Sequence, residues 1–372
     1  MTAADCDVFI AGCGPAGAAT AIALAAVAPK LRVCLADAGA DGGFRVGESV
    51  PPLLQRFMEH LGLWPSFLAQ AHQPSFRTIS AWGSERMESA EFFLQVHNTG
   101  WRLDRARFDR WLASQAWQGG ASGLTGKVRA LTKAGENWRI DCGAAGVLTG
   151  RCVVDATGRS AALSRFAGLK PVNHDRLTAC VGFFEASINK QHPAADAAVV
   201  ETFREGWWYT AATPSGQRVV ALMADSDWLR QSGAARLNVW RNYLTATDHV
   251  HALTDTDRLL APLKVWPSSS RCLNDTLPAG LLAVGDAASS FDPLSSQGII
   301  KALRSGIFAS YALADYLVKG DGGQGLTRYA ALIHREFNAY LNTLRNYYLL
   351  EQRWPDSPFW QRRHTINPVH PE

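Results

Sequence analysis

The sequence has no two cysteines with the C-x-x-C spacing that is typical of zinc sites and redox motifs. Its cysteines are odd in number and scattered, at positions 6, 13, 34, 142, 152, 180 and 272. This arrangement argues against a disulfide framework and against a metal site. It predicts buried, reduced thiols in a cytoplasmic protein that binds no metal.

The chain also has no strong excess of one charge. Its 37 basic and 33 acidic residues give a net charge of +4, which does not favour a nucleic acid as partner. Hydrophobic residues make up 47% of the sequence, an ordinary share for a globular protein that buries a core.

No apolar segment has the flanks of a signal or membrane segment. Residues 8–28 carry no charge, but Asp5 and Asp7 precede them instead of basic residues, and glycines and a proline lie near their start. Both features argue against export and against membrane spanning. We expect a buried strand followed by a buried helix, and no membrane partner.

A G-x-G-x-x-G motif opens the chain, with Gly12, Gly14, Pro15, Ala16 and Gly17 as its informative residues. It lies between an apolar run at 8–10 and an alanine-rich helical pattern at 15–28, and a second strand is expected at 31–36. In such a βαβ unit the glycines let a pyrophosphate approach the helix N-terminus. Asp37, twenty residues after Gly17, is placed to accept hydrogen bonds from ribose hydroxyls. A plain glycine turn is the alternative, and the register of all these parts favours a dinucleotide, either NAD or FAD.

Two later strand ends separate NAD from FAD. Residues 153–160 read Val-Val-Asp-Ala-Thr-Gly-Arg-Ser, and residues 281–288 read Leu-Leu-Ala-Val-Gly-Asp-Ala-Ala. With the first motif, they resemble the flavoprotein class of aromatic hydroxylases, geranylgeranyl reductases and flavin-dependent halogenases. In that class Asp286 would bind the ribityl chain, and a helix beginning near Ser296 would direct its positive end at the flavin. The resemblance implies FAD as the cofactor, with contacts from Ala156, Thr157, Gly158, Gly285 and Asp286.

Three further segments resemble the same class. Residues 47–52 read Gly-Glu-Ser-Val-Pro-Pro, like the loop beside the isoalloxazine ring, and residues 103–112 match L-D-R-x-x-F-D-x-x-L. Residues 292–298 read Asp-Pro-Leu-Ser-Ser-Gln-Gly, like a halogenase segment beside the flavin. The resemblance implies FAD contacts from Glu48, Ser49, Arg105, Pro293, Gln297 and Gly298. For Arg105, a solvated charge on a helix surface is the alternative.

Two halogenase motifs are altered in this chain. The F-K-x-x-I pattern, which holds the catalytic lysine of halogenases, reads Phe-Arg-Thr-Ile at residues 76–79. Arginine stays protonated and bonds as a fixed fork, so Arg77 is no simple replacement for that lysine. The W-x-W-x-I-P motif is reduced to Trp-Trp-Tyr-Thr-Ala-Ala at residues 207–212. Both changes argue against halogenation.

A smaller group of flavoproteins resembles more segments of the sequence than the halogenases do. Residues 47–52, 206–209, 291–299 and 353–363 are together similar to the flavoproteins that mature quinone-cofactor amino-acid oxidases. That resemblance implies hydroxylation of a tryptophan in a partner oxidase precursor, towards cysteine tryptophylquinone, with O2 as cosubstrate. Electrons would come from NAD(P)H or from a separate reductase. Two alternatives stay open: a small-molecule aromatic hydroxylase or tryptophan halogenase, and a non-catalytic flavin-binding chaperone.

Some polar and aromatic residues are candidates for chemistry near the flavin. Glu48 is a candidate acid or base, or it holds its loop through backbone N–H groups. Arg77 is a candidate for polarising an oxygen species or binding a carboxylate, with a surface role as the alternative. Trp207, Tyr209 and Phe291 are candidates for an aromatic pocket, although alternation along a strand sends neighbours to opposite faces. Core packing is the alternative for these rings.

The predicted fold is α/β: a Rossmann-like FAD-binding fold of the aromatic hydroxylase type, interrupted by an antiparallel sheet that covers the substrate, with helices at the C-terminus. The tail from residue 353 is expected to be irregular, and it either docks a protein substrate or packs on the enzyme itself. The expected units are an FAD-binding domain at 1–75, 102–180 and 270–325, a sheet domain at 76–101 and 181–269, and a C-terminal helix and tail at 326–372.

Overall fold

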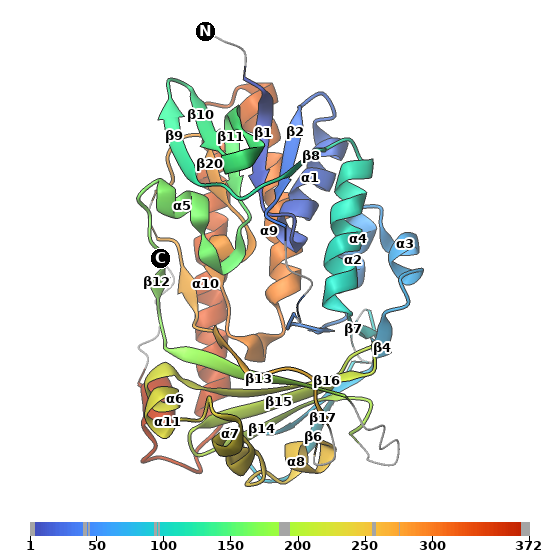
Figure 1. Ribbon diagram of the computed structural model, residues 1–372, viewed down its shortest axis with the longest axis vertical. Coiled ribbons are helices and arrows are strands. Elements are labelled where there is room, and N and C mark those ends of the chain that lie inside the picture. The colour runs from blue at the N-terminus through green and yellow to red at the C-terminus, as the bar shows by residue number, and fades with distance from the viewer. Residues whose placement is uncertain are drawn as a thin grey trace.

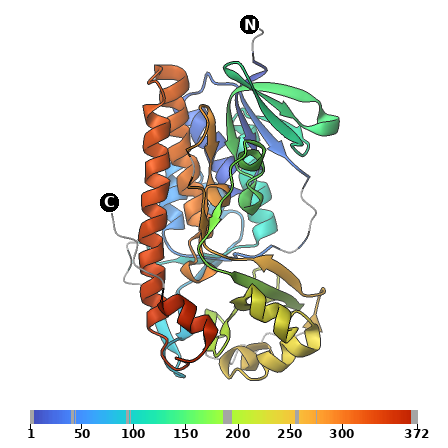
Figure 2. The ribbon, with the colours of Figure 1, turned by 90° about the vertical axis from the view of Figure 1, so that its left-hand side faces the viewer.

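The computed structural model contains two main sheets, joined by a long C-terminal helix that runs beside both (Figures 1 and 2). The structure describes residues 4–39, 43, 45–92, 95, 97–185, 194–254, 258–274 and 276–365. The predicted fold class is confirmed, since a Rossmann-like sheet, a separate antiparallel sheet and C-terminal helices are all present. The boundaries between units stay a prediction.

The first sheet contains the predicted βαβ unit. Strand β1 pairs in parallel with β2 on one side and β11 on the other, and β20 adds in parallel to β11. Parallel pairing brings the carboxyl ends of β1, β11 and β20 to one edge of the sheet, where a ligand is expected in such folds. The strands are β8 (Ser122–Thr125), β2 (Val33–Asp37), β1 (Cys6–Ala11), β11 (Val147–Asp155), β20 (Leu281–Ala283), β10 (Asn137–Asp141) and β9 (Ala130–Ala134).

Helices α1 (Pro15–Val27) and α9 (Gly298–Ala314) pack tightly against each other over this sheet. A Cβ atom at Gly306 would lie 2.5 Å from the carbonyl oxygen of Ala16, so this approach requires glycine. A π-helical turn, Asp315–Lys319, extends α9. The remaining helices around the first sheet are α2 (Leu54–His60), α3 (Trp64–Leu68), α4 (Arg105–Gln118) and α5 (Ala162–Phe166).

Asp104 caps α4, because its side chain accepts a hydrogen bond from the backbone N–H of Arg107. This cap fixes where the helix begins. It therefore sets the position of Arg105, the first residue of the helix, relative to the loop that precedes Glu48.

The second sheet is antiparallel except where β14 and β5 run in parallel. The antiparallel sheet predicted for this part of the chain is confirmed, with its four long strands between residues 177 and 225. Within the expected sheet unit at 76–101, residues 93, 94 and 96 lie outside the described residues. The strands are β17 (Arg258–Leu259), β18 (Lys264–Pro267), β13 (Leu177–Glu185), β16 (Gln217–Asp225), β15 (Gly206–Ala212), β14 (Ala198–Phe203), β5 (Arg77–Ala81) and β6 (Glu88–Glu91).

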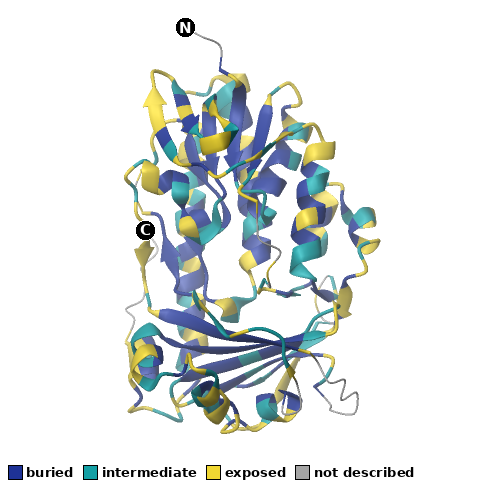
Figure 3. Cartoon of the chain, viewed as in Figure 1, coloured by how far each residue is buried: buried dark blue, intermediate teal, exposed yellow. Residues whose placement is uncertain are grey.

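Both faces of the second sheet are covered, and its strands are largely buried (Figure 3). Along β15, Trp207 belongs to the core on the face towards the first sheet, whereas Trp208 belongs to the core on the opposite face. That opposite core also contains side chains of α6 (Ser226–Ser232), α7 (Leu237–Leu244) and α8 (His249–Thr254).

Two small sheets connect the main ones. They are β3 (Ser49–Val50), β7 (Gly100–Arg102) and β4 (Gln73–Ser75), and β12 (Val172–Asn173), β19 (Arg271–Cys272) and β21 (Ser289–Ser290). In the first of them Ser49 pairs with Arg102, so the loop that carries Glu48 is tied to β7. The backbone N–H of Leu103 also donates to the carbonyl of Glu48, at 2.7 Å.

The prediction of an irregular tail is wrong. After α10 (Gln324–Leu349), helix α11 (Pro358–His364) folds back onto the second sheet (Figure 2). Phe359 and Trp360 are buried, and the indole N–H of Trp360 donates to the carbonyl of Phe203. A helix this short is marginal alone, so burial of its rings stabilises it. The described tail therefore packs on its own chain, and residues 366–372 lie outside the described residues.

Within the described ranges, none of the helices combines the length and the apolar character needed to cross a bilayer.

Candidate functional site

The turn between β1 and α1 is shaped by close backbone contacts. Gly12 has a φ of +108°, and a Cβ atom there would lie 2.3 Å from the carbonyl oxygen of Ala156. A Cβ at Gly17 would lie 1.9 Å from the carbonyl oxygen of Gly12. At Gly14, by contrast, a Cβ would meet no atom of the described chain within 4 Å. The packed glycines hold the turn, and the space before Gly14 fits a pyrophosphate at the helix N-terminus.

The acidic residues at the strand ends have different partners. Asp37 ends β2, and its carboxylate accepts from the N–H of Gly39 at 3.1 Å. Asp155 ends β11 fully buried, and it accepts from Thr157 and Ser164. Asp155 thus holds the turn of Ala156, Thr157 and Gly158, whereas the contact of Asp37 with a ribose stays a prediction.

Asp286 follows β20 and forms an ion pair that the sequence analysis missed. The Nζ atom of Lys301, on α9, lies 2.7 Å from a carboxylate oxygen of Asp286, and Lys301 is only 1% exposed. Burial alone would raise the pKa of Asp286, but the positive charges of Lys301, Arg159 and Arg271 outweigh it and lower that pKa. The Asp286 side chain keeps 39% of its surface exposed, so an ionised oxygen stays available for a ribityl hydroxyl. The sequence contains one sign of this buried ion pair, because Lys301 is the single charged residue in the apolar run of residues 298–303.

Replacing Lys301 by methionine tests this ion pair. We expect Lys301→Met to lower the free energy of unfolding by about 2 kcal/mol, since it leaves a half-buried carboxylate without its partner. We also expect about tenfold weaker FAD binding, because the charged acceptor is no longer held in place. Both are measured by denaturant titration and by fluorescence titration of the apoprotein with FAD.

Lys319→Met is the matched control, because Lys319 pairs with Asp315 on the surface and is 73% exposed. It should change neither quantity measurably. Equal effects of the two variants would contradict the proposed role of Lys301.

Arg105 ties α4 to the loop before Glu48. Its guanidinium pairs with Asp109 at 3.1 Å and donates to the carbonyl of Val46. Arg45 also binds Asp109, at 2.6 Å. Arg105 is therefore neither solvated nor alone, and its contact with FAD stays a prediction.

Glu48 belongs to a buried hydrogen-bond network that links the loop before β3 to strand β15 of the second sheet. The hydroxyl of Tyr209, on β15, donates to Oε1 of Glu48 and also bonds the hydroxyl of Ser49 at 2.8 Å. Burial raises the pKa of Glu48, although the Tyr209 hydrogen bond and Arg105 oppose this shift. The carboxyl group therefore favours its protonated form more than an exposed glutamate does.

A cavity of about 250 Å³ opens beside this carboxyl group. It lies between the start of α4 and the turn from β15 to β16, and its lining includes Arg45, Glu48, Leu103, Arg105, Phe183 and Gln217. A larger hollow, of about 560 Å³, is lined by Ala235, Leu237 and residues 259–263, but these side chains are all apolar and none belongs to the motifs above. The cavity beside Glu48 is the candidate site.

The other predicted pocket residues lie elsewhere in the interface between the sheets. Trp207 is buried, and its indole N–H donates to the hydroxyl of Tyr348 at 3.0 Å. Phe291 stacks on Tyr340 with ring centroids 3.9 Å apart. None of the three predicted rings, Trp207, Tyr209 and Phe291, is part of the described lining of the cavity, and their contact with a substrate stays a prediction. Arg77 forms an ion pair with Asp196 at 2.9 Å.

The segment before α9 forms a tight turn, Pro293–Ser295, and α9 begins at Gly298 after Gln297. A Cβ at Gly298 would meet no described atom within 4 Å, which leaves room before a second helix N-terminus. Asp292 holds this turn by accepting from the N–H of Leu294. The space at Gly14 and Gly298 and the carboxylate of Asp286 together fit FAD.

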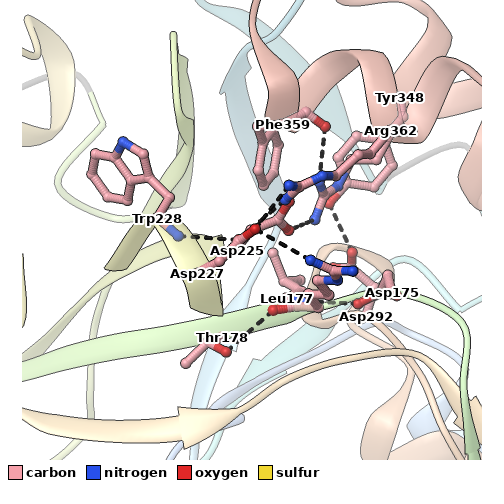
Figure 4. Close-up of polar contacts among 12 residues, drawn as sticks. Asp175, Leu177, Thr178, Asp225, Asp227, Trp228, Asp292, Tyr348, Phe359 and Arg362 are labelled. Atoms are coloured by element: carbon pink, nitrogen blue, oxygen red, sulfur yellow. Dashed lines mark hydrogen bonds and ion pairs between the residues drawn. The ribbon is translucent and has the colours of Figure 1, made fainter. Parts of the chain in front are cut away.

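Asp292 also connects the turn to the C-terminal tail (Figure 4). Its second carboxylate oxygen accepts from the hydroxyl of Tyr348 at 2.7 Å. Arg363 lies over the Tyr348 ring and forms an ion pair with Asp225, which also binds Arg362. The tail therefore supports the turn from which α9 begins.

Stability should depend on pH through Asp292. Burial, with the negative charge of Asp175, raises the pKa of Asp292 to about 7. The folded protein thus binds this proton more tightly than the unfolded chain, whose pKa is about 3.9. The resulting stability is fully present below about pH 4 and is lost as the pH rises towards 7. Thermal unfolding of Asp292→Asn between pH 4 and 8 should show a flatter profile than wild type, and an unchanged slope would contradict the assignment.

The family model for tryptophan halogenase matches residues 7–85 and 79–371. The chain belongs to the tryptophan halogenase family. LodB of Marinomonas mediterranea, named as an FAD-dependent oxidoreductase, is 31% identical over 371 residues, covering 97% of each chain. This member is accordingly a flavin-dependent oxidoreductase that uses FAD, and the class suggested by the motifs is confirmed.

Two solved structures share the fold of this family member. The flavin-dependent halogenase CmlS aligns with a TM-score of 0.86 and 21% identity, over 99% of this chain and 68% of its own. The peptidyl tryptophan dihydroxylase QhpG, essential for tryptophylquinone cofactor biogenesis, aligns with a TM-score of 0.77 and 24% identity, over 99% of this chain and 80% of its own.

Proposed function

We propose that the protein is an FAD-dependent monooxygenase that hydroxylates a tryptophan side chain of a partner oxidase precursor during tryptophylquinone cofactor formation. The similarity to LodB along nearly the whole chain and the activity named for QhpG support this proposal. The four segments that the sequence shares with the maturation flavoproteins support it as well.

The identity and the ion pair of Arg77 are the observation that favours hydroxylation over halogenation. The position of the halogenase lysine holds an arginine here, and its guanidinium is paired with Asp196. A guanidinium that stays protonated and is already paired is poorly suited to hold a reactive halogen species.

In this proposal an aromatic C–H, O2, two electrons and two protons give a C–OH group and water. FAD, when bound, supplies the electrons to O2, and it receives them from NAD(P)H or from a separate reductase. Glu48, which lines the cavity, contributes a proton at Oε2, while Tyr209 holds Oε1. The covering sheet keeps water away from the reacting ring.

Intact-mass analysis of the oxidase precursor, produced with and without this protein, tests the proposal. We expect added oxygen on a tryptophan-bearing peptide only when this protein is present. An unchanged precursor would contradict the proposal. Small aromatic compounds would then be tested as substrates, with and without halide. An unchanged precursor that still forms a complex with the protein would favour the chaperone alternative.

A further inference from the structure

The larger hollow, which Ala235, Leu237 and residues 259–263 line, lies on the face of the second sheet that is turned away from the first sheet (Figure 1). Leu259 and Leu263 pack against the core of that face, and Leu237 begins helix α7. The described lining is apolar throughout, and its volume of about 560 Å³ is large enough for several side chains. An apolar hollow of this size at a protein surface is typical of a place where another molecule binds.

The rim of the larger hollow is positively charged. Arg236 lies between two lining residues and is exposed, and Lys264 directly follows the last lining residue. The Nζ atom of Lys264 lies 5.8 Å from the ring centroid of Trp266, and in the described part of the chain neither cation forms an ion pair. Arg258, by contrast, is paired with Glu185. The rim therefore favours an acidic group on whatever binds there.

The larger hollow and the candidate cavity meet at the same end of β13. Glu185, the last residue of β13, pairs with Gln217 of β16 on one side and with Arg258 of β17 on the other. Gln217 lines the cavity, and Arg258 directly precedes Leu259, which lines the hollow. Two strand spacings, about 10 Å, therefore separate Gln217 from Arg258. Because β17 is the edge strand of the described sheet here, an extended chain can pass around it from the cavity to the hollow.

A backbone hydrogen bond joins the two linings. The N–H of Leu260, in the hollow, donates to the carbonyl of Phe183, in the cavity, at 2.8 Å. The ring of Phe183 belongs to the core on the face towards the first sheet, whereas Leu259 packs on the opposite face. The cavity and the hollow thus lie on opposite faces of one strand end, at a fixed separation.

We propose that the larger hollow binds an apolar side chain of the protein substrate, in an extended segment that runs from the target tryptophan around the edge strand β17. The proposal rests on the proposed function and narrows its substrate to a segment with a leucine-like residue beside an acidic one. The segment covers about 10 Å across the strands and also passes from one face to the other. Since an extended chain advances about 3.3 Å per residue, the tryptophan and the apolar residue are expected roughly four to six positions apart.

The protein substrate accounts for both hollows, whereas a small aromatic substrate would use only the cavity of about 250 Å³. Burial of an apolar side chain in the larger hollow adds affinity. Attraction of its acidic neighbour by Arg236 and Lys264 fixes the register of the segment.

The test measures binding of capped heptapeptides to the holoenzyme by isothermal titration calorimetry. The first peptide is Trp-Gly-Ser-Gly-Ser-Leu-Glu, the second has serine in place of leucine, and the third is Trp-Leu-Gly-Ser-Gly-Ser-Glu. Each is also made in the reverse order, since the direction of the segment is open. We expect wild type to bind the first peptide, in one of the two directions, about tenfold more tightly than the second and the third.

Two variants, each with a matched control, locate the leucine and the glutamate. Ala235→Trp fills the hollow from an exposed position and should remove the preference, whereas Ala144→Trp, exposed between β10 and β11, should keep it. Arg236→Glu should weaken binding of the first peptide about threefold to fivefold. Arg139→Glu, at an exposed position of β10, should leave it unchanged.

Three outcomes would overturn the proposal. The first is equal affinity of wild type for the first two peptides, which needs no variant to fold. The second is an unchanged preference in Ala235→Trp, which would place the leucine elsewhere. The third is a dimer of wild type that Ala235→Trp dissociates, because the hollow would then bind a second copy of this chain.

A failure of this proposal is distinct from a failure of the proposed function. If the precursor is hydroxylated equally by wild type and Ala235→Trp and the peptides show no preference, only the role of the hollow is wrong. If the preference for the first peptide is found and lost as expected but the precursor stays unmodified, only the proposed reaction is wrong.

Discussion

Glu48→Gln is expected to lower the rate of substrate hydroxylation by about a hundredfold or more while FAD stays bound. Glutamine keeps the shape and can still accept from Tyr209, but it has no proton to give at the position of Oε2. The backbone bond from Leu103 to the carbonyl of residue 48 is unchanged, so the loop should keep its position. Single-turnover hydroxylation, measured with the FAD content of each preparation, separates these effects.

Two further variants sharpen the test of Glu48. Glu59→Gln makes the same change in charge at an exposed position of α2, and its rate should equal that of wild type. Tyr209→Phe should show an intermediate loss, since it leaves Oε1 unpaired. Wild-type activity should fall as the pH rises through the raised pKa of Glu48, and the glutamine variant should lack this step. Normal turnover of Glu48→Gln would leave the residue only the role of holding its loop.

Trp360→Ala is expected to lower the free energy of unfolding by about 3–5 kcal/mol. The Trp360 side chain is fully buried, packs on Tyr348, and donates to the carbonyl of Phe203, so its removal leaves a cavity and an unpaired acceptor. Because Tyr348 also holds Asp292, FAD affinity should decrease as well. Chemical denaturation and FAD titration measure the two effects.

Trp354→Ala is the matched control in the same tail. Trp354 is half-buried and stacks on Trp360, so its loss should cost clearly less stability. If Trp360→Ala were as stable as wild type and only failed to modify the precursor, the tail would be a docking surface instead of part of the core.

The sequence by itself determined the cofactor and the fold class, and it predicted which strand ends lie near that cofactor. A glycine turn after a strand, an acidic residue after the next strand, and two further strand ends are local patterns, and parallel pairing then brings them to one edge. The class of enzyme followed from the resemblance of these segments to known flavoproteins. The cap of α4 at Asp104 is likewise a local feature, since an aspartate directly before a helix is a favoured capping residue.

Only the tertiary structure decided which charged and polar side chains contact each other. Lys301 lies fifteen residues after Asp286, and Tyr209 lies more than a hundred residues after Glu48, so no periodicity predicts either contact. The tail was expected to be irregular, since its short helix has few intrinsic signals and forms where Trp360 finds a buried position. The burial of Arg102 has no signal in the sequence, because a buried arginine and an exposed one look alike there. The physical reason is common to all of these: burial and pairing of polar groups depend on neighbours that are distant along the chain, whereas turns and strand ends depend on adjacent residues.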